Sequence, residues 1–485
     1  MDRCATQTGR GLLAVAALGL VAAMPLPVQG QPELCLECIT VRVGPPAVVR
    51  GPFPDELDAP FTGLRLADGT FRGFTANGAT FAVDGVDAWD MRGDRREVLV
   101  PGSAGSQSDC GRWLTTALRE GDVVVGFVHQ ERNCDYNAGH TDKSMAIAVS
   151  SDDGLHWTDL GTVITGTDTP TPGQTTGEGD CTMVDGHDGF LYAYCLRASD
   201  WQTVVARTPL GDLTGWRKYH EGSWHQPAQG GQATDIGFIG PTAGYLDDFG
   251  VVAAVTSDEW FEGVRLSLSQ DKVNFADLKD PLLPLDPSSW ERPVDTALVA
   301  YTTIVDPDTG SNTVSGPFLL SYLHVPGGKG FESRYLVHHE VKLALGEAPA
   351  AVQVGLALSR WVDSEQESYI SSTGPLTGER QAYRHDSVVA YLLTRAPDGV
   401  PSVKLVECAR EQSGHLEQML AEDGNCAAGY VRERTAGWLF SEPQPGTVPV
   451  YHCRAEPMAG HFVSSHRDCE GLGEMEATLG FGLAS

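Results

Sequence analysis

The feature that most restricts the fold of this chain is a large aromatic residue that recurs about every 59 residues. The anchors are Trp89, Trp157, Trp216, Phe275 and Phe331, separated by 68, 59, 59 and 56 residues. A repeat of this length is typical of units that cannot bury their apolar faces alone and must pack against copies of themselves. The sequence therefore predicts a radial array of about five units.

One anchor ends a turn motif. Residues 150–157 read Ser-Ser-Asp-Asp-Gly-Leu-His-Trp, which matches S-x-D-x-G-x-x-W, the Asp-box of β-propeller blades. In such a turn the Ser and Asp side chains bond backbone groups, the Gly takes a positive φ and the Trp packs between sheets. Weaker copies end at Trp216 and Phe275. We expect a structural role for this turn.

Each unit shows the same order of short strands. In the third unit the runs 180–184, 190–195 and 203–207 are rich in Val, Tyr and Thr, and a fourth run begins at Trp216. Four strands per unit is the pattern of one propeller blade. We therefore predict a five-bladed β-propeller over residues 38–347. The early run 39–43 is expected to pair with the last blade, which would hide two sheet edges.

Beyond residue 347 the period changes. Tyr369, His415 and His461 recur at intervals of 46 residues, and apolar runs recur with them. Three copies of this length predict an all-β threefold module over residues 348–485, either β-trefoil-like or made of three loosely stacked hairpin modules. Because these histidines recur with the repeat, we interpret them as structural.

The first 30 residues have the pattern of a secretory signal peptide. Arg3 and Arg10 precede an apolar core at 12–24, small residues lie at 28–30, and no second long apolar run follows. We therefore predict a soluble secreted protein that begins near Gln31.

Ten cysteines remain after Cys4 leaves with this segment, and in an oxidising compartment disulfides are the default. Nearest-neighbour pairing gives Cys35–Cys38, Cys110–Cys134, Cys181–Cys195, Cys408–Cys426 and Cys453–Cys469. Other connectivities remain open, as does a metal or redox role for the Cys35-x-x-Cys38 pair.

The charge balance restricts the partners. The chain has 34 Lys and Arg against 64 Asp and Glu, a formal net charge of −30. A phosphate backbone or an anionic membrane surface would repel such a chain, so we expect neither nucleic-acid nor membrane binding. We expect a monomer.

Two short stretches carry a family resemblance. Gly179-Asp-Cys181 followed by Gly189-Phe-Leu-Tyr-Ala-Tyr194, and more loosely Asp58-Ala-Pro60, resemble blade openings of the five-bladed propeller glycosidases. That superfamily includes the arabinanase and β-xylosidase group and the invertase and levanase group. The resemblance covers residues 38–347 and implies glycoside hydrolysis. The copy at 461–481 resembles a tandem repeat of secreted bacterial proteins, which implies an accessory role.

The resemblance implies that Asp58 is the base and Asp180 a residue that tunes the acid's pKa. The Glu expected at the start of the fourth blade is absent, because the run at 232–235 reads Gln-Ala-Thr-Asp. Substitutes for this acid are Glu131, Glu178 and Glu221.

Independently, carboxylates at the starts of inner propeller strands converge in one funnel, and glycoside hydrolysis needs one protonated and one ionised carboxyl group. Our catalytic candidates are Asp58, Asp180, Glu131, Asp235 and Glu178. The substrate-binding candidates are His129, Trp201, Trp260 and Asp258, since Trp rings can stack on sugars. We predict no cofactor and no metal ligands, although an acid-rich funnel could hold a structural calcium ion.

Three functions remain open. The first is a secreted glycoside hydrolase acting on a poly- or oligosaccharide. The second is a carbohydrate-binding or adhesive protein with a non-catalytic propeller, which the missing acid Glu would support. The third, less favoured, is a sialidase, which needs six blades, an arginine cluster and a Tyr nucleophile. Five anchors and one complete Asp-box argue against it.

Overall fold

The fold is all-β. The computed structural model describes residues 34–53, 57–258, 263–365, 368–412, 415–456 and 459–484, and Cys35–Ser485 form one compact unit. Besides strands, the described residues contain only short 3-10 helices: η1 (Leu36–Cys38), η2 (Tyr136–Ala138), η3 (Asp247–Phe249), η4 (Phe331–Ser333), η5 (Gly378–Ala382) and η6 (Cys469–Gly471).

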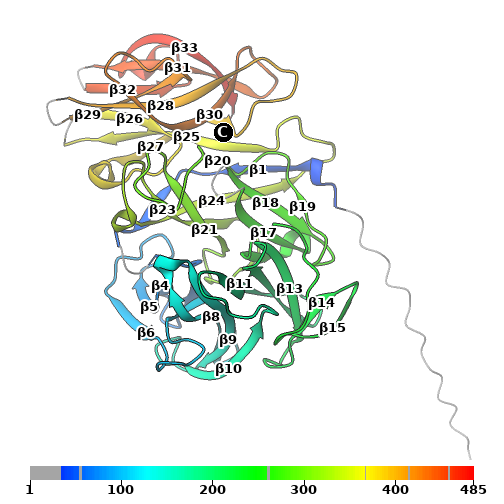
Figure 1. Ribbon diagram of the computed structural model, residues 1–485. Coiled ribbons are helices and arrows are strands. Elements are labelled where there is room, and N and C mark those ends of the chain that lie inside the picture. Colours follow the sequence, from blue (N-terminus) through cyan, green and yellow to red (C-terminus); the bar gives the residue numbers. More distant parts are fainter. Residues whose placement is uncertain are drawn as a thin grey trace, which may run out of the picture. The chain divides into compact units, whose positions relative to one another are not determined.

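Five antiparallel meanders follow one another along the first two thirds of the chain (Figure 1). The first contains β3 (Thr62–Arg65), β4 (Phe71–Asn77), β5 (Ala79–Gly85) and β6 (Arg95–Leu99). The second contains β7 (Gly111–Glu120), β8 (Val123–Asp135), β9 (His140–Ser150) and β10 (Thr158–Thr165). The third contains β11 (Thr175–Asp185), β12 (Phe190–Arg197), β13 (Gln202–Pro209), β14 (Arg217–His220) and β15 (Ser223–Pro227).

The last two meanders include additional short strands. The fourth contains β16 (Ala243–Leu246), β17 (Val251–Asp258), β18 (Gly263–Ser269), β19 (Ala276–Asp277) and β20 (Leu283–Pro284), with β22 (Thr313–Val314) beside β16. The fifth contains β21 (Leu298–Val305), β23 (Phe318–Val325) and β24 (Tyr335–Leu345), with β1 (Ile39–Val43) and β2 (Ala47–Arg50) both paired to β24. The predicted pairing of the early run 39–43 with the last meander is thus confirmed.

Threonine hydroxyls join the first four meanders at their first strands. In each case the hydroxyl of one meander accepts a backbone N–H of the next. The bonds run from Ala117 to Thr62 (3.0 Å), from Met183 to Thr116 (3.0 Å) and from Ala243 to Thr182 (2.9 Å). Each donor directly follows the next threonine of the series, which ends at Thr242. These threonines therefore occupy equivalent positions in successive meanders.

Other hydrogen bonds complete the cycle. The Ser257 hydroxyl on β17 donates to the Val299 carbonyl on β21 at 2.9 Å, which joins the fourth and fifth meanders. The Gly63 N–H on β3 donates to the carbonyl of Gly310, in the segment between β21 and β23, at 3.2 Å. Each meander is therefore hydrogen-bonded to the next, and the fifth to the first.

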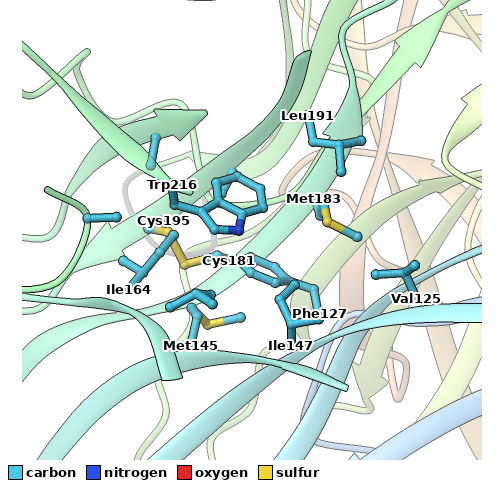
Figure 2. Close-up of a cluster of buried hydrophobic side chains, with 14 of the residues drawn as sticks. Val125, Phe127, Met145, Ile147, Ile164, Cys181, Met183, Leu191, Cys195 and Trp216 are labelled. Carbon is cyan, nitrogen blue, oxygen red and sulfur yellow. A yellow bond between two sulfur atoms is a disulfide. The ribbon is translucent and has the colours of Figure 1, made fainter. Parts of the chain in front are cut away.

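The apolar core is divided among the spaces between neighbouring meanders. Figure 2 shows the cluster between the second and third, where Phe127 stacks on Trp216 with ring centroids 5.6 Å apart. The disulfide between Cys181 and Cys195 lies in the same cluster. Each fully buried large side chain contributes about 1.5–3 kcal/mol, so these layers stabilise the contacts between meanders.

The Asp-box turn is confirmed as structural. The Ser150 hydroxyl accepts the Gly154 N–H at 2.9 Å, and the Asp152 carboxylate accepts the His156 N–H at 2.9 Å. The Trp157 indole N–H donates to the Gly154 carbonyl at 3.0 Å. The Ser, Asp and Trp side chains that define the motif thus close the turn, at a Gly whose φ is 82°.

All five nearest-neighbour disulfides are present: Cys35–Cys38, Cys110–Cys134, Cys181–Cys195, Cys408–Cys426 and Cys453–Cys469. The first bond gives the Cys35-x-x-Cys38 pair a structural role. Each bond links cysteines within one local unit, as the sequence spacing predicts.

The C-terminal part contains nine described strands in three units. The units are β25 (Val354–Asp363), β26 (Ser368–Ser372) and β27 (Arg384–Leu393); β28 (Ser402–Gln412), β29 (His415–Glu422) and β30 (Val431–Phe440); and β31 (Thr447–Ala455), β32 (Ala459–Ser464) and β33 (Gly473–Leu483). In each unit the first strand pairs with the other two. The third strands also pair with one another, for example Leu393 with Trp438 and Phe440 with Phe481. The three units therefore share one pairing order, and the predicted β-trefoil-like or stacked-hairpin module stays a prediction.

Some predictions lie beyond these observations. The predicted signal peptide, residues 1–30, lies outside the described residues. The domain boundary near residue 347 stays a prediction, because β1 pairs with β24 on one side and with β25 on the other. Among the described residues, no helix has the length and apolar character needed to cross a membrane.

The threonine contacts predict a specific loss of stability. Thr116→Val keeps the volume but leaves the buried Met183 N–H without its acceptor, which should lower the free energy of unfolding by about 1–3 kcal/mol. Denaturant unfolding under non-reducing conditions measures this. The matched control is Thr158→Val on the exposed surface of β10, for which we expect a change below about 0.5 kcal/mol. Equal effects at both positions would contradict the structural role of Thr116.

Candidate active site

Two bulges redirect side chains on the first strands of the third and fifth meanders. Register shifts in the pairing of β11 with β12 and of β21 with β23 fall at Asp180 and Tyr301. Their φ angles are 52° and 51°, and Trp201, after β12, has a φ of 57°. Residues other than glycine rarely adopt this left-handed backbone conformation, and those held in it cluster at functional sites.

These three residues line one cavity of about 230 Å³. Its wall comes from the second, third, fourth and fifth meanders and from the segments before β3, β16 and β21. The lining residues are Pro60, Lys143, Asp180, Leu196, Trp201, Phe238, Pro241, Thr242, Thr256, Ser257, Trp290, Ala300, Tyr301 and Thr302. The cavity thus combines one carboxylate and one ammonium group with several aromatic rings.

Lys143 connects two carboxylates. Its Nζ donates to Asp180 Oδ2 at 2.6 Å and lies 3.9 Å from Glu131 Oε1. Glu131 on β8 is directly opposite Lys143 on β9 in the antiparallel pairing, so the strand register brings these charges together. The two carboxylates share one cation.

His129 lies between the same two carboxylates. Its Nδ1 accepts the backbone N–H of Asp180 at 3.0 Å. When the ring is neutral, the proton is therefore on Nε2, which donates to Glu131 Oε1 at 3.1 Å and lies 3.8 Å from Asp180 Oδ1. The ring is buried and packs against Trp113. His129 thus fixes the relative positions of the two acids.

Both oxygens of Glu131 are occupied. Oε2 accepts the Tyr136 hydroxyl at 2.6 Å and the Thr141 hydroxyl at 3.1 Å. Burial would raise the pKa of Glu131, but the hydrogen bond from His129 and the charge of Lys143 outweigh it and lower this pKa to about 2. Glu131 is therefore an ionised, fully hydrogen-bonded support of the site.

Asp58 has the opposite electrostatic environment. It lies two residues before Pro60 of the cavity wall, and its Oδ1 accepts the Tyr301 hydroxyl at 3.2 Å. Burial raises its pKa, the charge of Arg334 at 3.9 Å and the Tyr301 hydrogen bond oppose that rise, and the negative charges of Glu131 and Asp180 add to it. The net shift is upward.

Asp180 is shifted downward. Burial would raise its pKa, but Lys143 and His129 lower it below its ordinary value. The site therefore contains one carboxyl group that retains its proton more readily than a free Asp, and another that ionises more readily. Such a division is what acid-base chemistry with two carboxyl groups requires.

The structure brings together most of the predicted site residues. Asp58, Asp180, Glu131 and His129 form one group, and Trp201 lines the same cavity. Trp260 and the side chain of Asp258 lie outside the described residues. The remaining two candidates, Glu178 and Asp235, are not part of the group.

Glu178 has a structural partner instead. Its carboxylate is buried and accepts from Lys218 Nζ at 2.8 Å, while the same ammonium donates to the carbonyls of Thr165 and Gly231. Asp235 is exposed and lies 3.7 Å from the Arg197 guanidinium. Neither residue lines the cavity.

Sequence reasoning missed four site residues: Lys143, Tyr301, Arg334 and Trp290. The pairing of Lys143 with Glu131 depends on strand register, which composition does not give. Tyr301 and Arg334 come from the fifth meander, and a search for carboxylates does not select aromatic or basic residues. The signal for Tyr301 would have been a polar-tipped aromatic inside an apolar strand.

No family model matches the chain, and no curated protein matches it. Among solved structures, it is similar to Zg3597, a family 117 glycoside hydrolase from Zobellia galactanivorans, at 10% identity and a TM-score of 0.43, over 64% of this chain and 91% of that one. It is also similar to an α-L-arabinofuranosidase from Lactobacillus brevis at 12% identity and a TM-score of 0.37, over 60% and 91%. A third solved structure, a glycoside hydrolase, shares 14% identity, with a TM-score of 0.39, over 64% and 93%.

The placement of Glu178 gives a test. Lys218→Met would leave a buried carboxylate without its cation, which should lower the free energy of unfolding by about 3–5 kcal/mol. Thermal and denaturant unfolding measure the loss. The control is Lys279→Met, which removes an exposed ion pair with Asp398 and should cost at most about 1 kcal/mol. If Lys218→Met is as mild as the control, the buried pair is not a structural support.

Proposed function

We propose that the protein is an exported glycoside hydrolase that cleaves a poly- or oligosaccharide in the funnel of a five-bladed β-propeller. The five meanders would be the blades of residues 38–347, and residues 348–485 would be an accessory module. The cyclic hydrogen bonding of the meanders supports the propeller interpretation. The five disulfides are compatible with export to an oxidising compartment.

The observation that carries the proposal is a pair of carboxyl groups at one cavity: Asp180 lines it, and Asp58 accepts the hydroxyl of Tyr301, which also lines it. The pKa values of the two groups are displaced in opposite directions. Glycosidases protonate the leaving oxygen with one carboxyl group and use an ionised partner as base or nucleophile. The side chains of Asp58 and Asp180 are 27% and 20% exposed, so both retain access for a ligand. Glu131, at 9%, is enclosed.

This charge distribution favours Asp58 as the proton donor and Asp180 as the ionised partner, with Glu131, His129 and Lys143 as positioning residues. The assignment is the reverse of the one that the family resemblance implies for Asp58. It also accounts for a site without a Glu from the fourth blade, because the acid is supplied by the first.

The aromatic wall supports a sugar as the ligand. Trp201 is 41% exposed at the cavity, and Trp290 lies on the wall from the segment before β21. Flat aromatic faces bury the apolar faces of sugar rings while their hydroxyls bond to polar neighbours. Hydroxyl groups of Thr242, Thr256 and Ser257 line the same cavity.

Two substitutions test the roles. Asp180→Asn should lower kcat/KM by about 10²–10⁴-fold or more on any oligosaccharide that the wild type cleaves. Asp58→Asn should do the same on an oligosaccharide, but should lose far less on a glycoside with a nitrophenyl leaving group, which departs without protonation. Reducing-sugar and nitrophenolate release measure the two rates.

The matched control is Asp235→Asn, an exposed Asp outside the cavity, which should retain wild-type rates. Thermal midpoints of all three variants should lie close to that of the wild type. If Asp58→Asn loses equal activity on both substrates, Asp58 is the base or nucleophile, as the resemblance implies.

Lys143 should set the acidic limb of the pH profile. Asp180 must be ionised to act, so activity falls as the pH drops through its pKa, which Lys143 lowers. Lys143→Gln removes this charge, raises the Asp180 pKa and should move the acidic limb of kcat/KM to higher pH. Lys342→Gln, which removes a surface ion pair with Glu340, should leave the profile unchanged. An unmoved limb in Lys143→Gln would contradict the role of Asp180.

One observation favours a second function. Among the described residues, the fourth meander contributes hydroxyl groups but no carboxylate to the cavity wall, whereas the resemblance implies an acid there. A carbohydrate-binding protein without catalysis is consistent with this. A wild-type protein that binds a glycan and releases no sugar across plant, fungal and bacterial polysaccharides would establish that alternative. A sialidase is less consistent with the site, because a sialidase needs an arginine cluster. No arginine is among the described residues that line the cavity, and the single guanidinium of Arg334 lies beside Asp58.

A further inference from the structure

Each C-terminal unit has an acidic residue at the same bulge. The pairing of the first strand with the third shifts register at equivalent places in the three units. Each unit has two such shifts, and the residue skipped at the one nearer the start of the third strand is Asp386 in the first unit, Glu433 in the second and Glu476 in the third. The threefold repeat therefore places one carboxylate at each of three equivalent positions.

In the first two units an arginine balances this carboxylate. Arg360 Nε donates to Asp386 at 2.6 Å, and the Arg380 guanidinium binds both oxygens of Glu433, one of them at 2.9 Å. A guanidinium is always charged and binds carboxylates through a planar fork. A guanidinium thus contacts the carboxylate at each of these two bulges, and Arg360 also binds Glu470 through its two terminal nitrogens.

The third unit has two histidines in place of an arginine. His452 Nδ1 on β31 lies 3.3 Å from Glu476 Oε2, and His461 Nε2 on β32 lies 3.6 Å from the same oxygen. Imidazole rings thus face this carboxylate where a guanidinium faces it in the other two units.

The three side chains have the composition and spacing of a metal site. One ligand atom from each lies within 4.8 Å of the other two. Around a tetrahedral zinc ion, with bonds of about 2.0–2.2 Å, neighbouring ligand atoms lie about 3.3 Å apart. The two nitrogen–oxygen distances of 3.3 and 3.6 Å are close to that value. The rings are nearly parallel, with centroids 5.0 Å apart, and rotation about the soft χ2 torsion directs both lone pairs to one ion.

The surroundings of the two rings are largely buried. His452 is 6% exposed, and its Nε2 and the Nδ1 of His461 are buried without a hydrogen-bond partner among the described residues. The other nitrogen of each ring faces Glu476. Each ring thus directs one nitrogen toward the same carboxylate oxygen, as a shared ion would require.

We propose that His452, His461 and Glu476 bind one divalent transition-metal ion, of which zinc is the best chemical match. Imidazole nitrogens select zinc and its first-row neighbours over calcium and magnesium, which prefer oxygen ligands. The ion would connect β31, β32 and β33 and supply the charge that an arginine supplies in the other units. Three protein ligands leave a fourth position for water or an external donor, on the side where Glu476 is 38% exposed.

Metal binding to the full mature chain tests this proposal. The protein is treated with a chelator, incubated with Zn²⁺ and passed through a desalting column, and bound zinc is measured by elemental analysis and calorimetric titration. The wild type should retain one equivalent, and Co²⁺ should give the visible spectrum of a tetrahedral site. Zn²⁺ should also raise the thermal midpoint, because it binds the folded state.

His461→Gln and Glu476→Gln should weaken zinc binding at least tenfold and abolish the rise in thermal midpoint. Both side chains are partly exposed, so the variants should fold, which circular dichroism checks. The matched control is Glu433→Gln, the equivalent bulge carboxylate of the second unit, which should bind zinc like the wild type.

Three results would overturn the proposal. The first is a wild type that retains no zinc after desalting. The second is retention that His461→Gln and Glu476→Gln leave unchanged, which would place the ion at other surface groups. The third is an equal loss in Glu433→Gln, which would show a general effect of charge. None of these readouts depends on glycoside hydrolysis.

Discussion

A backbone N–H accepted by a threonine hydroxyl of the preceding meander is the contact on which the rest of the structure depends. Thr62, Thr116 and Thr182 repeat this bond at equivalent positions of their first strands. The bond sets the relative position of the first strands of neighbouring meanders along their length. The bulges that carry Asp180 and Tyr301 lie on the same set of first strands. Groups more than a hundred residues apart therefore meet at one cavity.

The electrostatics of the site then depend on the position of Lys143, which lies closer to Asp180 and Glu131 than to Asp58. Lys143 is hydrogen-bonded to Asp180 and lies near Glu131, whereas Asp58 has Arg334 at a longer distance. Burial penalises the charge of all three acids, and only two of them have a close partner that outweighs the penalty. The pKa of Asp58 is therefore raised, whereas the pKa values of Glu131 and Asp180 are lowered. At the C-terminal bulges, too, the partner of the carboxylate differs between equivalent positions. It is an arginine in the first two units and a pair of histidines in the third.

Much of the organisation could be predicted from sequence because it follows local rules. Aromatic spacing indicated the five units, the Asp-box indicated its own turn, and nearest-neighbour cysteines gave the disulfides. The convergence of Asp58, Asp180 and Glu131 followed from placing acids at strand starts and in the loop above them. These inferences use spacing along the chain and need no knowledge of how strands align.

Two of the errors have the same physical origin, which is strand register. Glu178 and Asp180 are two apart, so an ideal strand would direct them to the same face. The bulge after Gly179 separates them, and Glu178 pairs with Lys218 while Asp180 reaches the cavity. Lys143 was missed for the same reason, because its importance comes from lying opposite Glu131. The threonine series was missed because its spacing is unequal and each member is an ordinary residue of a strand.

The most direct test of the central claim is a crystal structure of Asp180→Asn with an oligosaccharide selected by glycan binding. If Asp58 is the proton donor, we expect a glycosidic oxygen within hydrogen-bond distance of its carboxyl group, with residue 180 on the other side of the scissile bond and a sugar ring against Trp201 or Trp290. A sugar bound away from this cavity, or one whose linkages all lie beyond the reach of Asp58, would contradict it.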